Sequence, residues 1–86
     1  MLVQFDNLLE PEKERLKRTH PRGHDIFNAI LENLKRTPTA SATKLPNWQW
    51  LKIFTPDIQP ATEIRLCFLE GGERVLVKKF AWEFVG

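Results

Sequence analysis

The stretch that decides the fold reads Thr62-Glu-Ile-Arg-Leu-Cys-Phe-Leu, then Glu70-Gly-Gly-Glu, then Arg74-Val-Leu-Val-Lys-Lys-Phe-Ala-Trp-Glu-Phe84. Two runs rich in aliphatic, β-branched and aromatic residues flank a pair of glycines. Gly71 and Gly72 can adopt the positive φ that a tight turn between twisted strands requires, so the pattern predicts a β-hairpin.

The first strand of this hairpin alternates between two faces. Ile64, Leu66 and Phe68 share one face, whereas Arg65 and Cys67 belong to the other. Such alternation predicts a half-buried strand. Because Cys67 lies in mid-strand among apolar residues, we interpret it as a small hydrophobic residue rather than a nucleophile.

The second strand has a less regular pattern. Val75 and Val77 share one parity, whereas Phe80 and Trp82 share the other. Two explanations stay open at this point. Either both faces of the strand are partly covered, or a β-bulge near residues 78–79 changes the parity.

The composition limits the kind of protein this can be. The 86 residues form one domain over residues 1–86, which buries about 60% of its unfolded surface. One cysteine excludes an internal disulfide, and no cluster of ligands suggests a metal or a cofactor. No apolar run approaches the length of about 18 residues that a membrane span needs. We therefore expect a soluble cytoplasmic protein whose net charge of +2 is too small to indicate nucleic acid by itself.

Two helices are expected ahead of the hairpin. Pro11 suits the first turn of a helix that extends to about Arg18 and is anchored by Leu16. The segment 20–24 contains proline and glycine and ends that helix. A second helix should begin with Asp25 as its cap. Its apolar stripe at spacings of three and four consists of Ile26, Phe27, Ile30, Leu31 and Leu34.

The remaining segments complete the expected fold. Residues 1–5 form a short strand, residues 37–46 a loop, and residues 47–54 a further strand. In that strand Leu51 and Ile53 are assigned to the core-facing side, opposite Trp50, Lys52 and their neighbours. The order strand, helix, helix and three strands predicts an α+β domain with two helices on one face of a small antiparallel sheet.

Several short motifs together resemble the RelE/ParE superfamily of toxins, and most closely its phage-related HigB branch. The motifs cover roughly 55 residues and run through Ile30-Leu-Glu-Asn-Leu34, Lys44-Leu45, Trp50-Leu-Lys-Ile53, Ile64-Arg-Leu-Cys-Phe68, Gly71-Gly72 and Val75-Leu-Val77. The resemblance implies a toxin of a toxin–antitoxin system that cleaves messenger RNA on the ribosome. Its partners would be the ribosome or messenger RNA and an antitoxin protein.

The sequence departs from that family at the residues that transfer protons. It contains no tyrosine, and no histidine follows His24, whereas these toxins usually use a C-terminal tyrosine or histidine. Whether the chain is an endoribonuclease therefore stays open, and we expect weak or no cleavage of free RNA. His20 and His24 are interpreted as ordinary loop histidines, since Pro21 and Gly23 prevent one-face helical geometry.

Candidate site residues follow from the expected parity of the strands and from the basic surface of the first helix. Cations that would stabilise phosphate, and so carry the catalysis, are Lys52, Arg65, Lys78 and Lys79. Aromatic and basic residues that would bind RNA are Trp50, Trp82, Lys13, Lys17 and Arg18. We expect Trp50, Lys52 and Arg65 to emerge together on the sheet face opposite the helices.

Alternative functions remain on the same scaffold. The charged residues can form an ordinary solvated face, and tryptophans in a small protein usually belong to the core. A second hypothesis is a non-catalytic inhibitor, such as a small phage-borne protein, that presents its sheet edge and tryptophans to a protein partner. A gyrase inhibitor of the ParE kind lies between the two, and no residue selects it.

Overall fold

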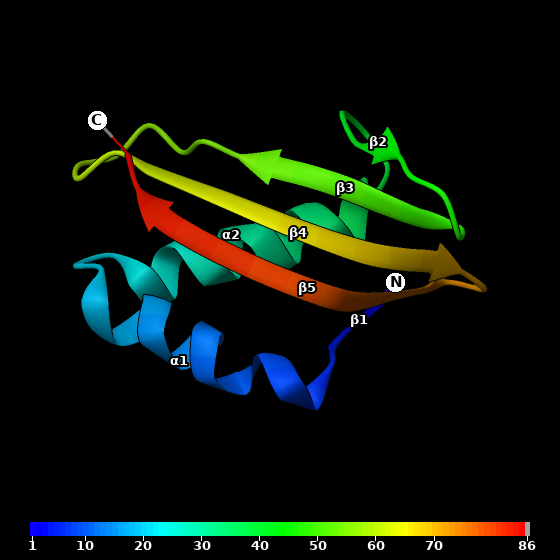
Figure 1. The fold of residues 1–86 in the computed structure, drawn as a ribbon, viewed down its shortest axis with the longest axis horizontal. Helices are drawn as coiled ribbons and strands as arrows, with labels where there is room; N and C mark the ends of the chain where they lie inside the picture. The colour runs from blue at the N-terminus through cyan, green and yellow to red at the C-terminus, as the bar shows by residue number, and fades with distance from the viewer. Residues whose placement is uncertain (86) are drawn as a thin grey trace.

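The structure, a computed structural model, describes residues 1–85 and has two helices packed on a five-stranded sheet (Figure 1). The elements in chain order are β1 (Leu2–Phe5), the 3-10 turn η1 (Asn7–Leu9), α1 (Glu10–Thr19), α2 (Gly23–Arg36), β2 (Thr43–Lys44), β3 (Gln49–Phe54), β4 (Thr62–Gly71) and β5 (Arg74–Phe84). This confirms the expected α+β class, and the element order matches the expected one apart from one additional strand. The short strand β2 lies in the segment that was expected to be a loop.

The sheet is mixed rather than wholly antiparallel. Its strand order is β1-β5-β4-β3-β2. The pairs from β5 to β2 are antiparallel, whereas β1 pairs with β5 in parallel, with Val3 opposite Val75. Between β1 and β5 the chain passes through both helices and the strands β2, β3 and β4, and a long connection of this kind is what a parallel pair needs.

A β-bulge in β5 explains its irregular pattern. The register places Cys67 opposite Lys79 but the next residue, Phe68, opposite Val77, which leaves Lys78 as the extra residue. The bulge changes the parity of the strand. As a result Val77 and Phe80 are both buried on the helix side. Of the two explanations that the sequence left open, the bulge near residues 78–79 is confirmed.

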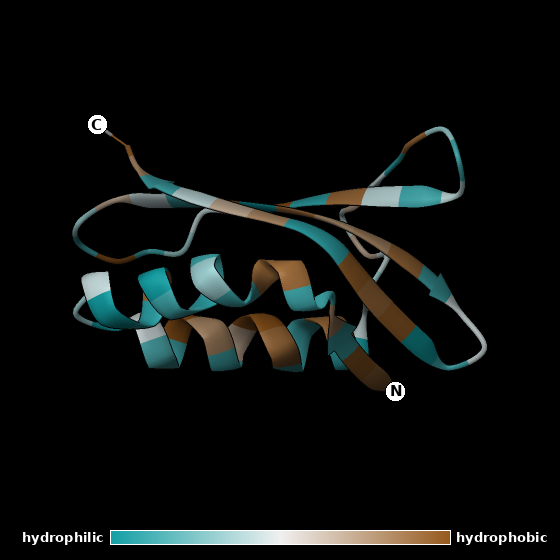
Figure 2. Cartoon of the chain, turned by 60° about the horizontal axis from the view of Figure 1, so that its bottom comes forward, coloured by the Kyte–Doolittle hydropathy of each residue, from teal (hydrophilic) through white to brown (hydrophobic). Residues whose placement is uncertain are grey.

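The core lies between the sheet and the helices, which form one layer beneath it (Figure 2). The predicted inner face of β4 is confirmed, because Ile64, Leu66 and Phe68 are fully buried. They belong to one apolar cluster with the stripe of α2, with Leu16 of α1 and with residues of β5. The buried members of the cluster are Leu16, Ile26, Phe27, Ile30, Leu34, Ile64, Leu66, Phe68, Val75, Val77, Phe80 and Trp82.

Strand β3 has the opposite face inward from the one expected. Trp50 and Phe54 pack against the core, and Lys52 between them is buried, whereas Ile53 is half exposed on the outer face. Both parities of this strand carry large apolar side chains. The alternation therefore could not identify the inner face, and the assignment of Leu51 and Ile53 to the core was wrong.

The two helices meet closely at Gly23, the first residue of α2. A Cβ atom at this position would lie 2.6 Å from the Cα of Lys17, and also too close to the carbonyl of Leu16. Arg22 occupies the cap position of α2, and Asp25 lies in its first turn. The expectation that Asp25 caps α2 was therefore wrong. The helix begins at Gly23, where the close crossing of α1 and α2 needs glycine, so Asp25 lies inside the first turn.

The turn between β4 and β5 uses Gly72 and Glu73, whose φ angles are 56° and 63°. Two successive residues with positive φ are typical of tight hairpin turns. The expected hairpin is confirmed, but its central pair is shifted by one residue from Gly71 and Gly72. No helix within residues 1–85 has the length and apolarity needed to cross a membrane.

We predict that Gly23→Ala destabilises the protein while Gly71→Ala is nearly neutral. The added methyl group of the first variant meets helix backbone, whereas nothing lies within 4 Å of the corresponding position at Gly71. The expected loss for Gly23→Ala is on the order of 2 kcal/mol or more, because α1 and α2 must separate. Urea unfolding of both variants measures the difference. Equal stability would contradict the close helix crossing.

Stability should depend on pH through Asp6. Its carboxylate accepts hydrogen bonds from the Leu8 amide at 3.0 Å and from Lys78 Nζ at 3.0 Å, and these bonds, the amide first, lower its pKa from 3.8. The ionised group therefore stabilises the fold above that value, and this contribution is lost as the pH falls through the lowered pKa.

We accordingly expect Asp6→Asn to be less stable than the wild type near neutral pH, and we expect the difference to shrink as the pH falls below 3.8. Thermal unfolding across that range measures the gap. Lys78→Ala should reproduce only part of the effect, since the Leu8 amide remains bonded. A gap that is constant with pH would show that Asp6 does not act through its charge.

Candidate nucleic-acid interface

The four cations expected to bind phosphate do not converge in the structure. Lys52 faces the helices rather than solvent, and only 5% of its surface is exposed. Its ammonium group donates to Asn33 Oδ1, to the carbonyl of Thr37 at 2.8 Å and to the carbonyl of Pro38 at 3.2 Å. Lys52 therefore ties β3 to the C-terminal end of α2, and its placement beside Arg65 on one face was wrong.

Burial changes the acid–base property of Lys52. Desolvation penalises the ammonium form and lowers the pKa of Lys52 from 10.5. Among residues 1–85, Lys52 makes no ion pair with a carboxylate, so its acceptors are neutral oxygens. This arrangement holds a loop in place and leaves the ammonium group unavailable to a phosphate on the outer face.

Arg65 points away from the helices, as its parity predicted. Its guanidinium donates to Glu63 at 2.9 Å and to Glu83 at 3.2 Å on the outer face of the sheet. The hydrogen bond and charge of Glu63, and then the charge of Glu83, raise the pKa of Arg65. Two carboxylates thus compensate one arginine, so this cluster is not a site with excess positive charge.

The two lysines at the bulge, Lys78 and Lys79, differ in their surroundings. Lys78 pairs with Asp6 at 3.0 Å, next to the end of β1. Lys79 is exposed opposite Cys67 and forms no ion pair among the residues that the structure describes. Of the expected phosphate-binding set, Arg65 and Lys79 share the outer face, while Lys52 and Lys78 lie elsewhere.

The basic residues of α1 are mostly neutralised within the helix. Lys13 pairs with Glu10 at 2.7 Å and Lys17 with Glu14 at 3.7 Å. Arg18 donates to the carbonyl of Glu14. These short-range pairs produce a surface of alternating charge rather than a basic patch, and Lys13 and Lys17 are only partly exposed.

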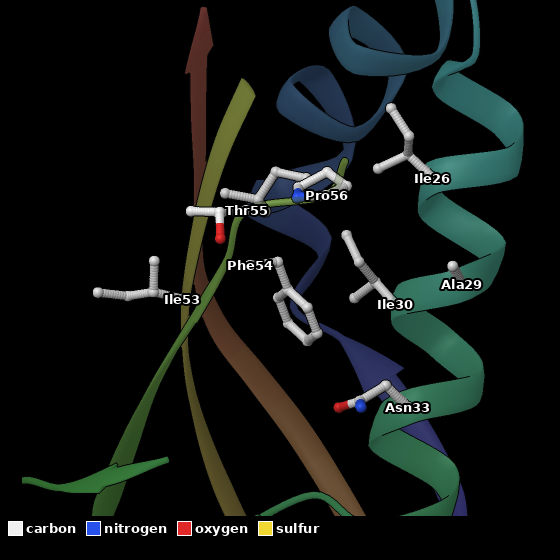
Figure 3. A pocket seen from close by; sticks show the side chains of 9 residues that line it. Ile26, Ala29, Ile30, Asn33, Ile53, Phe54, Thr55 and Pro56 are labelled. Carbon is white, nitrogen blue, oxygen red and sulfur yellow. The ribbon is translucent and has the colours of Figure 1, made fainter. Parts of the chain in front are cut away.

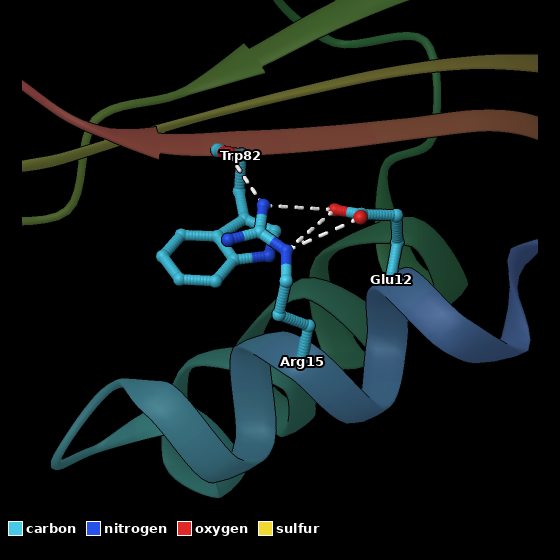
Figure 4. Close-up of polar contacts among 3 residues, drawn as sticks. All are labelled: Glu12, Arg15 and Trp82. Atoms are coloured by element: carbon cyan, nitrogen blue, oxygen red, sulfur yellow. Dashed lines mark hydrogen bonds and ion pairs between the residues drawn. The ribbon is translucent and has the colours of Figure 1, made fainter.

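Trp82 is buried rather than exposed on the outer face. The bulge in β5 turns it toward α1, where the guanidinium of Arg15 lies 4.1 Å from the centre of its ring (Figure 4). Arg15 also donates to the Trp82 carbonyl at 3.2 Å and pairs with Glu12 at 3.0 Å. Trp82 therefore holds α1 against the sheet, and its expected role as an RNA-stacking residue was based on the wrong face.

The tip of the β2–β3 hairpin brings a cation close to two tryptophans. Lys44 Nζ lies 5.7 Å from the centre of the Trp48 ring and 5.9 Å from that of Trp50. Trp48 is 81% exposed, whereas Trp50 packs partly against the core. Lys44 makes no ion pair among residues 1–85, so its charge is available to a ligand. This group is called the hairpin-tip cluster below.

The backbone at the tip is unusual for a bulky residue. Asn47 and Trp48 have φ angles of 64° and 63°. The left-handed conformation suits asparagine but costs a tryptophan about 1 kcal/mol or more. Sequence reasoning named Trp50 but missed Trp48 and Lys44 as site residues. The available signal was Asn47 after Pro46, which favours a turn between two strands and so places the next residue in solvent.

The hairpin-tip cluster has the properties of a small stacking platform. An exposed ring offers a face to a nucleic-acid base, and a neighbouring ammonium group can meet a phosphate. Comparison of the chain with known protein families, with curated proteins and with solved structures gives no match. The resemblance to RelE and HigB toxins therefore stays a prediction.

We predict that Lys52→Met destabilises the protein and that Lys79→Met does not. The first variant leaves three buried or partly buried oxygen acceptors without a donor, which should cost roughly 1–3 kcal/mol. The second removes an exposed charge, which usually changes stability by less than about 0.5 kcal/mol. Chemical denaturation gives both values. If Lys52→Met were as stable as Lys79→Met, the bonds from Lys52 to the end of α2 would carry no stability.

Proposed function

We propose that this protein is a toxin-like protein of the RelE/HigB kind that binds single-stranded RNA, either messenger RNA or RNA on the ribosome. The observation that carries the proposal is the hairpin-tip cluster, in which Lys44 Nζ lies within 5.9 Å of the ring centres of both Trp48 and Trp50. Its rings and charge are the features that bind a single strand without reading a fixed sequence.

The exposure of Trp48 supports a binding role. A tryptophan in the interior gains stability from burial, but this side chain is largely in solvent and its backbone is strained. Strained residues that persist at the surface are more frequent at functional sites. Lys79, which is exposed on the outer sheet face and forms no ion pair within residues 1–85, can extend contacts to the backbone of a longer strand.

The positions of the cations support RNA binding better than cleavage of RNA by this chain alone. The proposed catalytic cations do not converge, since Lys52 is buried and Lys78 pairs with Asp6. Cleavage through the RNA 2′-hydroxyl also needs groups that accept and donate protons. Any cleavage would therefore depend on groups that the ribosome supplies, and an antitoxin protein remains the expected partner.

A specific observation favours the second candidate function, inhibition of a protein partner. The outer face of the sheet carries apolar residues at positions where a solvated strand usually has polar ones. They are Leu51, Ile53, Cys67, Leu69 and Leu76. A non-catalytic inhibitor could use this face without the hairpin-tip cluster.

We predict that Trp48→Ala weakens binding to a single-stranded RNA oligonucleotide. Loss of one stacked base should cost about 1–3 kcal/mol, which corresponds to roughly 5- to 150-fold in affinity. Lys44→Ala should lower the affinity and reduce the slope of log affinity against log salt concentration by about 0.7, the value for one phosphate contact on a single strand.

The matched control is Leu8→Ala, which also truncates a large exposed side chain, 86% exposed, but outside the cluster. It should bind RNA like the wild type. If Trp48→Ala and Lys44→Ala retain full affinity, or if none of the proteins binds RNA, the proposal fails. Growth arrest on expression distinguishes the two candidate functions. If Trp48→Ala still arrests growth but Leu69→Lys does not, inhibition of a protein partner is favoured over RNA binding.

A further inference from the structure

A separate pocket of about 380 Å³ lies between α2 and the end of β3 (Figure 3). Its walls are mostly apolar. Ile26 and Ile30 come from α2, while Phe54 and Pro56 come from the end of β3 and the segment that follows. Figure 3 shows the Phe54 ring directed toward Ile30 across this space. At this end β3 pairs with β4 on one edge only, because on its other edge β2 pairs with just Trp50 and Leu51.

One end of the pocket is polar. Asn33 lines the pocket, and its Oδ1 accepts a hydrogen bond from Lys52. Because an ammonium group can only donate, the amide oxygen must face Lys52 and the amide NH₂ must face away from it. Within residues 1–85 that NH₂ group has no protein acceptor. Asn33 therefore offers a free donor to whatever occupies the pocket.

Lys52 supplies an uncompensated positive charge at the same end. Its side chain is nine-tenths buried or more, it has no carboxylate partner in the described chain, and Nζ lies 5.6 Å from the centre of the Phe54 ring. A buried charge without a counter-charge is costly, so an anion near it is favoured. The charge acts on the pocket through the Asn33 amide, which stands between them.

We propose that this pocket binds a small amphipathic monocarboxylate. Its apolar body would lie among Ile26, Ile30, Phe54 and Pro56, and its carboxylate would accept a hydrogen bond from the Asn33 amide, with Lys52 as the counter-charge. The volume is at the small end of the range of about 300–1,000 Å³ for ligand pockets. An apolar pocket with a few convergent polar groups is the usual form of such sites.

The charge pattern selects a carboxylate over other occupants. A neutral apolar ligand would leave the Asn33 donor unpaired and Lys52 uncompensated, and unpaired buried donors oppose binding. A cation would meet Lys52. A nucleic acid is too polar for the apolar walls. The pocket lies at the end of β3 that is away from the hairpin tip, so carboxylate binding there does not depend on the proposed RNA binding.

The test is a titration of the protein with octanoate, followed by NMR of the Asn33 side-chain amide and the Ile30 methyl groups, with calorimetry for affinity. Octanol and octanamide test the apolar body without the charge, and acetate tests the charge without the body. Octanoate should bind with shifts at both residues. The neutral analogues should bind about tenfold or more weakly, since a hydrogen bond to a charged group is lost.

Two variants separate this site from general effects on the fold. Ala29 is exposed and lines the pocket, so Ala29→Phe should fill the space and lower octanoate affinity about tenfold or more without unfolding the chain. Asn33→Asp places a carboxylate against Lys52. It should raise the melting temperature while abolishing octanoate binding, because the counter-charge is then internal.

Asn28→Asp is the matched control, since it makes the same change at an exposed position of the same helix. It should bind octanoate like the wild type. Equal binding of octanol and octanoate, or full octanoate affinity in Ala29→Phe, would overturn the proposal. RNA affinity should be unchanged in Ala29→Phe, so a failure here is distinguishable from a failure of RNA binding.

Discussion

Burial of one face of the β4–β5 hairpin against α2 is the interaction on which the structure depends. Ile64, Leu66 and Phe68 have no exposed surface, and they meet the apolar stripe of α2 in one cluster. The buried apolar residues within 1–85 form this one cluster, and a domain of this size depends on it. The bulge in β5 follows from this constraint, because it lets Val77 and Phe80 both face the helices despite their opposite parity. The same bulge turns Trp82 inward, where it stabilises α1 rather than a ligand.

The buried Lys52 lies in β3 between the two regions with proposed roles, the hairpin-tip cluster and the apolar pocket. Its strand, β3, begins at the hairpin tip and ends at the apolar pocket, and the lysine binds the end of α2 between them. A buried ammonium group requires oxygen acceptors, and the carbonyls at the end of a helix and in the following loop supply them. The position of α2 relative to β3, and hence the width of the pocket, therefore depends on a polar contact within an otherwise apolar layer.

Charge on the surface is largely balanced by short-range pairs. Lys13, Arg15 and Lys17 of α1 pair with acidic residues three positions earlier, and Arg65 pairs with two glutamates. Such exposed pairs contribute little to stability, but they remove the excess charge that a phosphate-binding face needs. Lys44 differs from these paired cations, because it forms no ion pair within residues 1–85 and lies beside Trp48, which is 81% exposed. This is why the parity of the strands was a poor guide to which cations are available at an interface.

The sequence by itself determined the α+β class, the element order, the hairpin from residue 62 to residue 84, and the inner faces of α2 and β4. These features follow from local periodicity and turn residues, which act over a few positions. Only the tertiary structure decided the face of β3, the parallel pairing of β1 with β5, the burial of Lys52 and Trp82, and the pairing of the cations. The physical reason is that both parities of β3 and β5 carry large apolar side chains. Which face is then buried depends on the packing of distant elements, and the exposure of Trp48 and the partners of Lys52 depend on the same packing.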